Sequence, residues 1–196
     1  MVRRVVADQS RSAVNDSGPI LRVANDADLD AIAEVMRASV LELFPQFYDE
    51  RQTASAAVHI AHADPTLVAD GTYFVHDLGD EIVACGGWSR RGRLYTGSDD
   101  QEGDDRLLEP ATEAAHIRAM FVRPDWTRRG LGRAILAAGH DAARSEGFQR
   151  LDLGATLPGV ALYRAFGFRE VEPFVVTMPD GVTIEAVAME RPIDPV

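Results

Sequence analysis

The sequence predicts an α/β domain in which a mixed, mostly antiparallel sheet carries helices on its faces. Two patterns of apolar residues alternate along the chain: short runs typical of strands, and longer segments with the 3.6-residue period of helices. These segments follow the order strand, helix, helix, three strands, helix, strand, helix, two strands. A chain of 196 residues is long enough to bury one such core, and a sheet covered by helices is the economical arrangement.

The first strand and the first two helices come from the N-terminal third of the domain. Residues 20–24 form a short apolar run, and residues 25–40 then place apolar side chains near helical spacing. Asn25 or Asp26 is expected to cap this helix. Residues 49–64 predict a second, less regular helix.

Two hairpins are predicted, one in the middle of the sheet and one at its C-terminal end. Residues 72–78 and 81–90 are predicted to be strands joined by Gly79–Asp80, a two-residue turn. Residues 169–178 and 182–190 flank a Pro-Asp-Gly turn. Both pairs are therefore expected to be antiparallel.

Between these hairpins lie a loop, two strands and two helices. Residues 91–112 are acidic and rich in glycine, which predicts a solvated loop. A strand at 113–122 ends at Arg123–Pro124, because the residue before proline avoids helical geometry. The remaining elements are a helix after Gly130 that stops at Gly147, a strand at 150–155, and a short helix with Pro158 in its first turn and Gly167 beyond its end.

Composition limits the classes of function. Residues 1–18 are expected to be a polar, mobile leader without the apolar segment of a secretory signal, and residues 19–196 a single domain. No apolar run is long enough to span a membrane, and a net charge of −11 disfavours nucleic acids and anionic membranes as partners. The single Cys85 excludes an intrachain disulfide and fits a cytoplasmic setting. All twenty basic residues are arginine, so lysine chemistry is excluded.

Residues 122–136, VRPDWTRRGLGRAIL, concentrate arginine and glycine in this acidic chain. A glycine turn at the start of a helix directs unpaired N–H groups and the positive end of the helix dipole at a ligand. Gly130 and Gly132 leave room for a phosphate to approach the backbone, and arginine binds phosphate oxygens in a bidentate manner. The Walker motif is excluded because it needs lysine, and the dinucleotide fingerprint because Ile135 stands where its third glycine belongs. A purely structural turn with solvated arginines remains the alternative.

The segment MFVRPDWTRRGLGRAIL resembles the acetyl-CoA signature of the GNAT N-acyltransferase superfamily, and ATLPGVALYRAFGFRE resembles the second signature of that family. The order of elements matches as well. The resemblance implies a GNAT fold with six to seven strands, about four helices and a sheet splayed between the fourth and fifth strands. It also implies acetyl-CoA as cosubstrate and an amine as acceptor, taken from a small molecule or a peptide. Some family members are homodimers, and the sequence does not determine the oligomeric state.

The same resemblance assigns roles to individual residues. The backbone of the fourth strand would bind the pantetheine arm, and the N–H groups of the glycine turn would hold the pyrophosphate. Thr127 and Thr156 depart from the family pattern, so their side-chain contacts are in doubt, whereas the backbone cradle is unaffected. The residues implied in cofactor binding are Met120, Phe121, Val122, Thr127, Arg128, Arg129, Gly130, Leu131, Gly132, Arg133 and Thr156.

The acyl centre has one preferred acid and several candidate bases. Tyr163 matches the family tyrosine that faces the cofactor sulfur, and a phenol can protonate a departing thiolate. The Met120 N–H would support the oxyanion. His116, which lies on one face with Arg118 and Met120 if no bulge intervenes, is the candidate base; Glu113 and a water chain are the alternatives.

Other residues have competing interpretations. Four aromatic residues are predicted either to line the acceptor pocket or to pack in the core: Phe44, Phe47, Tyr48 and Trp88. Cys85 is interpreted as a core residue, and His59, His62 and Asp64 as an exposed helix face, not a metal site. The acidic loop residues Asp99, Asp100, Glu102, Asp104 and Asp105 could attract a cationic amine, although a solvated face is the preferred interpretation. A catalytically silent acyl-CoA-binding sensor and an acidic adaptor remain as rival functions.

Overall fold

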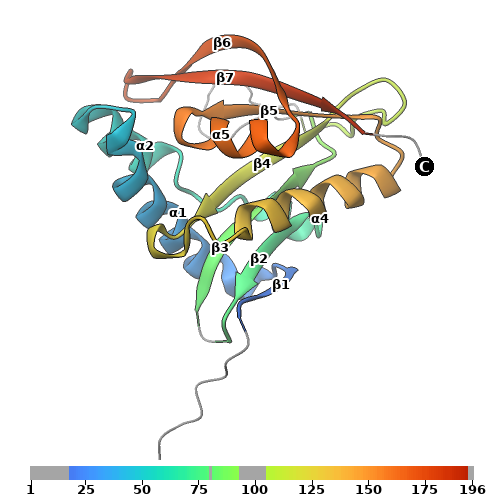
Figure 1. Ribbon diagram of the computed structural model, residues 1–196, viewed down its shortest axis with the longest axis horizontal. Helices are drawn as coiled ribbons and strands as arrows, with labels where there is room; N and C mark the ends of the chain where they lie inside the picture. The colour runs from blue at the N-terminus through green and yellow to red at the C-terminus, as the bar shows by residue number, and fades with distance from the viewer. Residues whose placement is uncertain (1–17, 80, 93–104, 194–196) are drawn as a thin grey trace, which may run out of the picture.

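The computed structural model describes residues 18–79, 81–92 and 105–193. Its centre is a seven-stranded sheet in the order β1-β2-β3-β4-β5-β7-β6 (Figure 1). All pairs are antiparallel except β4 and β5, which are parallel. The strands are β1 (Ile20–Val23), β2 (Tyr73–Asp77), β3 (Ile82–Ser89), β4 (Ala115–Val122), β5 (Arg150–Thr156), β6 (Arg169–Thr177) and β7 (Thr183–Pro192). The predicted mixed, mostly antiparallel sheet is confirmed.

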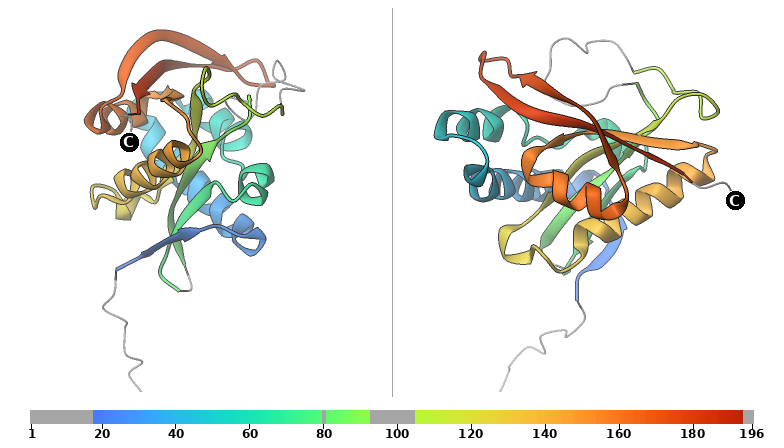
Figure 2. Two further views of the ribbon diagram at one scale, coloured as in Figure 1. Left: turned by 90° about the vertical axis from the view of Figure 1, so that its right-hand side faces the viewer. Right: turned by 45° about the horizontal axis from the view of Figure 1, so that its top comes forward.

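Helices cover both faces of this sheet. Figure 2 shows α1 and α2 on one face and α4 on the other. Ile32, Met36 and Val75 belong to the core on the α1 face, and Trp88 and Leu136 to the core under α4. The helices are α1 (Leu29–Leu43), α2 (Glu50–His59), α3 (Pro65–Ala69), α4 (Leu131–Ser145) and α5 (Leu157–Phe166), with short 3-10 turns at Asp26–Asp28, Phe44–Gln46 and Pro124–Trp126.

Several boundaries were readable from the sequence. Asn25 accepts a hydrogen bond from the Ala27 N–H and caps the 3-10 turn that leads into α1. Gly167 (φ 101°) ends α5 in the left-handed conformation expected of a glycine cap. Helix α3 was not predicted, although Asp64 caps it and Pro65 begins it. Of the predicted turn at Gly79–Asp80, Asp80 lies outside the described residues, and so does the leader except for Gly18.

The sheet opens between β4 and β5, as predicted. Their ladder consists of Ala115 opposite Leu151 and His116 opposite Asp152, and it ends there, although β4 continues to Val122 and β5 to Thr156. Beyond that point neither strand has the other as a hydrogen-bonding neighbour. A cavity can therefore enter the middle of the sheet, lined by strand backbone that pairs only on its outer side.

A partly buried ion-pair network links β1 to β2 and to the 3-10 turn before α1. The Arg22 guanidinium donates to both carboxylate oxygens of Asp28 at 2.7 Å and to Asp77 at 2.7 Å. The hydrogen bonds from Arg22 lower the pKa of Asp28. The pKa of Asp77 is lowered first by the Gly79 N–H and then by Arg22. The charged forms of both carboxylates therefore stabilise the folded state.

Stability is expected to fall in acid because of this network. A carboxylate whose pKa is depressed in the folded state stabilises it above the unfolded pKa of about 4, and this contribution is lost as the pH falls through the folded pKa. Asp28→Asn should lower the free energy of unfolding by about 1–2 kcal/mol at pH 7, since Arg22 is partly exposed. The difference from wild type should shrink at pH 3 in urea unfolding. Asp141→Asn, at an exposed carboxylate, is the control; an equal effect of both variants would contradict the assignment.

Candidate active site

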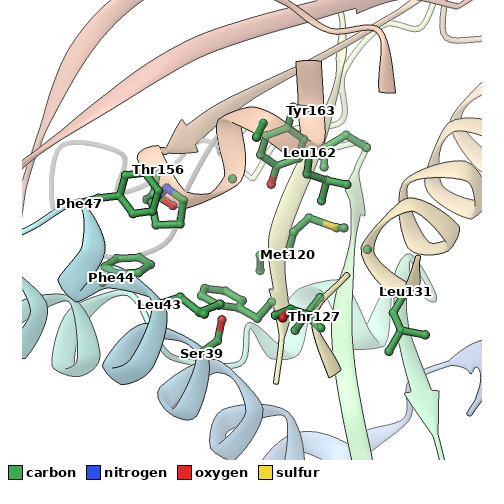
Figure 3. A pocket seen from close by; sticks show the side chains of 18 of the residues that line it. Ser39, Leu43, Phe44, Phe47, Met120, Thr127, Leu131, Thr156, Leu162 and Tyr163 are labelled. Atoms are coloured by element: carbon green, nitrogen blue, oxygen red, sulfur yellow. The ribbon is translucent and has the colours of Figure 1, made fainter. Parts of the chain in front are cut away.

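A cavity of about 710 Å³ occupies the opening between β4 and β5. Its floor comes from α1 and the turn that follows, its roof from α5 and β6, and one end from the start of α4. Figure 3 shows Met120 near its centre, between Ser39, Leu43 and Phe44 on one side and Thr127 and Leu131 on the other. The volume suits a small ligand or part of a larger one. The cavity therefore connects the predicted anion site to the predicted acyl centre.

A β-bulge shapes the β4 side of this cavity. Ala119 has a positive φ of 49°, and Ala119 and Met120 together oppose the single Gly86 on β3. The buried Tyr73 hydroxyl reaches from β2 and donates to the Ala119 carbonyl at 2.6 Å. Met120 consequently packs with the core under α4, whereas Ala119 packs with the core under α1. The bulge fixes the strand geometry at the point where the cavity is deepest.

The bulge also corrects one sequence prediction. Strict alternation would have placed His116, Arg118 and Met120 on one face, and this is wrong because the extra residue changes the phase after Arg118. Met120 instead shares its core with Ile117. The sequence offers no clear signal for this bulge, since Ala119 is neither glycine nor asparagine.

The start of α4 has the backbone geometry that the predicted anion seat requires. Gly130 has φ 83° and Arg128 has φ 62°, both left-handed, and no side chain caps the first turn of α4 within the described chain. A Cβ built on Gly130 would meet no atom within 4 Å, so this position faces open space at the cavity wall. The free N–H groups and the helix dipole therefore face a space large enough for an anion.

The arginines around this turn are not equivalent. Arg128 and Arg133 line the cavity. Arg129 does not; its guanidinium lies 4.4 Å from the centre of the Trp126 ring and donates to the Asp125 carbonyl. Arg123 is paired with Glu81 and Asp125. Only part of the positive charge noted in the sequence is therefore directed at the cavity.

The two threonines that depart from the family pattern lie in the wall of the cavity. The Thr127 hydroxyl donates to the Pro124 carbonyl at 2.9 Å. Its proton is thus directed at its own turn and not at the cavity. Thr156 ends β5 at the N-cap of α5, where its side chain makes no capping hydrogen bond.

Tyr163 extends from α5 into the roof of the cavity, with its hydroxyl directed toward Met120 (Figure 3). Its ring packs edge-on against Phe168, with ring centroids 5.9 Å apart. Burial raises the pKa of the Tyr163 phenol above its ordinary value of 10. The hydroxyl therefore stays protonated at neutral pH and is able to donate.

Neither candidate base lines the cavity. His116 Nδ1 contacts Asp152 across the last pair of the β4–β5 ladder, and the imidazole is buried there. Glu113 accepts two hydrogen bonds from Arg106, which lower its pKa to about 2. A carboxylate of such low basicity is a poor proton acceptor.

The predicted pocket aromatics divide into two groups. Phe44 and Phe47 line the cavity, whereas Trp88 is buried and packs edge-on against Phe148. The Tyr48 hydroxyl donates to the Glu185 carbonyl at 2.7 Å and accepts from the Leu157 N–H at 2.9 Å. Tyr48 thus ties the chain after α1 to β7 and to the first residue of α5, the helix that carries Tyr163.

The remaining sequence candidates are structural. Burial raises the pKa of the Cys85 thiol to about 12, as expected of a core residue. In the described part of the chain, no three His, Cys, Asp or Glu side chains form a metal-binding group: His59 faces Asp180, and Asp64 pairs with Arg118. Of the five acidic residues singled out in the loop, Asp105 is described, whereas Asp99, Asp100, Glu102 and Asp104 lie outside the described residues.

Sequence reasoning missed residues contributed by β5, β6 and the C-terminal end of α1. The lining includes Ser39, Leu43, Ile60, Gly154, Phe174 and Val176. Phe174 packs on Gly154, where a Cβ would come within 2.9 Å of its ring. Glycine in the middle of a strand was the one available signal, since it often marks a close approach by another group.

The fold and cavity define a class of protein: a splayed α/β sheet that presents an anion seat at a helix start and a buried phenol over an open strand edge. Among the described residues, no helix has the length and apolar character needed to span a membrane. The chain matches the family model described as "Acetyltransferase (GNAT) family" over residues 36–168, and it belongs to that family.

Individual relatives support this assignment at different levels. The chain is 41% identical over 59 residues to a mycothiol acetyltransferase of Clavibacter michiganensis subsp. michiganensis, a match that spans 29% of this chain and 19% of that protein. A GCN5-related N-acetyltransferase structure from Rhodopseudomonas palustris is similar over 90% of this chain and 96% of that chain (TM-score 0.68, 20% identity). A phosphinothricin acetyltransferase from Sinorhizobium meliloti in complex with acetyl-CoA is similar over 92% and 94% (TM-score 0.59, 22% identity). At these identities the solved structures establish the fold.

Proposed function

We propose that this GNAT-family acetyltransferase moves the acetyl group of acetyl-CoA to a primary amine by direct attack in a ternary complex. The observation that carries the proposal is the continuity of one cavity from the anion seat at Gly130, past Met120, to the Tyr163 hydroxyl. The structurally similar phosphinothricin acetyltransferase was solved with acetyl-CoA bound.

The residues present fit that cosubstrate. Backbone N–H groups from Arg128 to Arg133 would hold the pyrophosphate, and the Arg128 side chain lines the wall beside them. Arg133 also lines the wall, where its guanidinium donates to the Ala165 carbonyl at 3.4 Å. The strand edge at Met120, Phe121 and Val122, which β5 leaves unpaired, would bond the amides of the pantetheine arm. Acetyl-CoA supplies the activated thioester; the protein supplies its position.

The chemistry needs few groups from the protein. The amine nitrogen attacks the thioester carbonyl carbon, the Met120 N–H supports the oxyanion, and the carbon–sulfur bond then breaks. The Tyr163 hydroxyl gives its proton to the departing thiolate. The proton lost by the amine passes to water, because neither His116 nor Glu113 lines the cavity. Cys85 is buried, its pKa is raised and it does not line the cavity, so it is not placed to form an acyl-enzyme.

Two measurements test this function. Calorimetry should show stoichiometric binding of acetyl-CoA, and release of free CoA in the presence of a panel of primary amines should exceed release without amine. Absence of binding at millimolar acetyl-CoA would contradict the proposal and favour the adaptor interpretation. Binding without amine-dependent release would instead favour a silent acyl-CoA sensor.

A further inference from the structure

The cavity wall that faces the acyl centre from the α1 side is mostly apolar. Its polar members are Ser39 and Gln46, and six apolar side chains from four segments of the chain form the rest: Leu43, Phe44, Phe47, Ile60, Phe174 and Val176. In Figure 3, the labelled members of this wall lie across Met120 from the α4 start. Anything that approaches the acyl centre from this side meets hydrocarbon on most sides.

Among the residues that the structure describes, no aspartate or glutamate lines the cavity, and the charged lining residues are Arg118, Arg128 and Arg133. The nearby Asp64 does not line the cavity, and its carboxylate lies 3.3 Å from the Arg118 guanidinium. The interior is therefore locally positive or neutral, although the whole chain carries a net charge of −11.

The apolar wall is held in place by packing. Phe44 is buried and contacts Tyr48, with ring centroids 5.2 Å apart, and Tyr48 is bonded to both β7 and α5. Phe174 rests on Gly154. Phe44 and Phe174 are therefore held by packing, whereas Phe47 lies at the exposed rim of the cavity.

We propose that the acceptor is a primary monoamine whose body is an aliphatic chain or aromatic ring with no second cationic group. This inference rests on the proposed function and specifies its acceptor. Burying an ammonium against this wall would cost its hydration without a compensating carboxylate, whereas an apolar body gains from leaving water. Polyamines are therefore expected to be poor acceptors, even though the net charge of −11 attracts cations.

A matched pair of acceptors tests the inference. Hexylamine and 1,5-diaminopentane offer the same reacting amine and differ in that a terminal ammonium replaces a methyl group. With saturating acetyl-CoA, kcat/KM for hexylamine should exceed that for the diamine by about 100-fold. Equal or higher kcat/KM for the diamine, with acetyl transfer intact, would overturn the acceptor class and leave the proposed function standing. Failure of every amine to accelerate CoA release would overturn both.

A pair of variants identifies the wall as the cause. Phe47 is 49% exposed at the rim of the cavity, so Phe47→Glu should fold, and the new carboxylate should reduce the preference for hexylamine by about 10-fold. Val58→Glu places the same charge at a 61% exposed position on α2 outside the cavity lining and should leave the preference unchanged. An equal change in both variants would indicate a general charge effect and would contradict a role for this wall.

Discussion

Tyr163→Phe is expected to lower kcat by about 100-fold or more while acetyl-CoA binds with unchanged affinity. The variant removes only the hydroxyl directed into the cavity (Figure 3). Without it the thiolate must leave without a proton or take one from water. Because the raised pKa of Tyr163 keeps the phenol protonated at neutral pH, the wild-type acid is present in full, and the loss should appear across the neutral range.

The thermal stability of the Tyr163→Phe variant distinguishes the loss of a proton donor from a loss of structure. Tyr163 packs against Phe168 through its ring, which phenylalanine retains. The midpoint of thermal unfolding should therefore stay near that of wild type. If kcat on the best acceptor is unchanged, Tyr163 is a packing residue and the acid is another group or water.

Gly130→Val is expected to weaken acetyl-CoA binding by about 100-fold or more, measured by calorimetry. A β-branched residue resists the left-handed φ of 83° that Gly130 adopts. The new side chain would also project into the open space at the seat, where no protein atom lies within 4 Å of a Cβ. Backbone strain would disturb the N–H groups at the start of α4, and the new side chain would block the approach of a phosphate to them.

Gly181→Val is the matched control. Gly181 lies in the turn between β6 and β7, has φ 78°, and likewise has no atom within 4 Å of an added Cβ. It carries the same strain far from the anion seat in the chain and does not line the cavity. Both variants should lose similar stability in urea, and only Gly130→Val should lose affinity for acetyl-CoA. An equal loss of affinity in both would mean that global destabilisation, not the seat, is responsible.

The sequence could locate the glycine turn before α4 because the signals of that turn are local. A helix that starts with glycine needs no partner to expose its first N–H groups, so residues 128–133 could be placed before any tertiary contact was known. Tyr163 was identified because the segment ATLPGVALYRAFGFRE resembles the second signature of the GNAT family. Such features depend on neighbours along the chain, which the sequence contains directly.

The candidate base and the acceptor wall could not be placed in the same way. His116 and Glu113 looked suitable on their own strand, but their partners, Asp152 and Arg106, come from other segments and hold them outside the cavity. Phe174 reaches the site only because β7 pairs with β5 and β6 pairs with β7, which brings the last hairpin over Gly154. These are contacts between segments distant in sequence.

By itself, the sequence determined the order of the strands and of every helix except α3, and the glycine turn before α4, because periodicity, caps and turns act over a few residues. Its resemblance to the GNAT family pointed to Tyr163. The tertiary structure alone decided the bulge at Ala119, where the Tyr73 hydroxyl reaches from another strand. The tertiary structure also determined which side chains form the apolar wall and that Tyr48 holds the start of α5. Side chains separated by many residues in the chain meet only when the sheet is assembled, and that assembly decides what the cavity accepts.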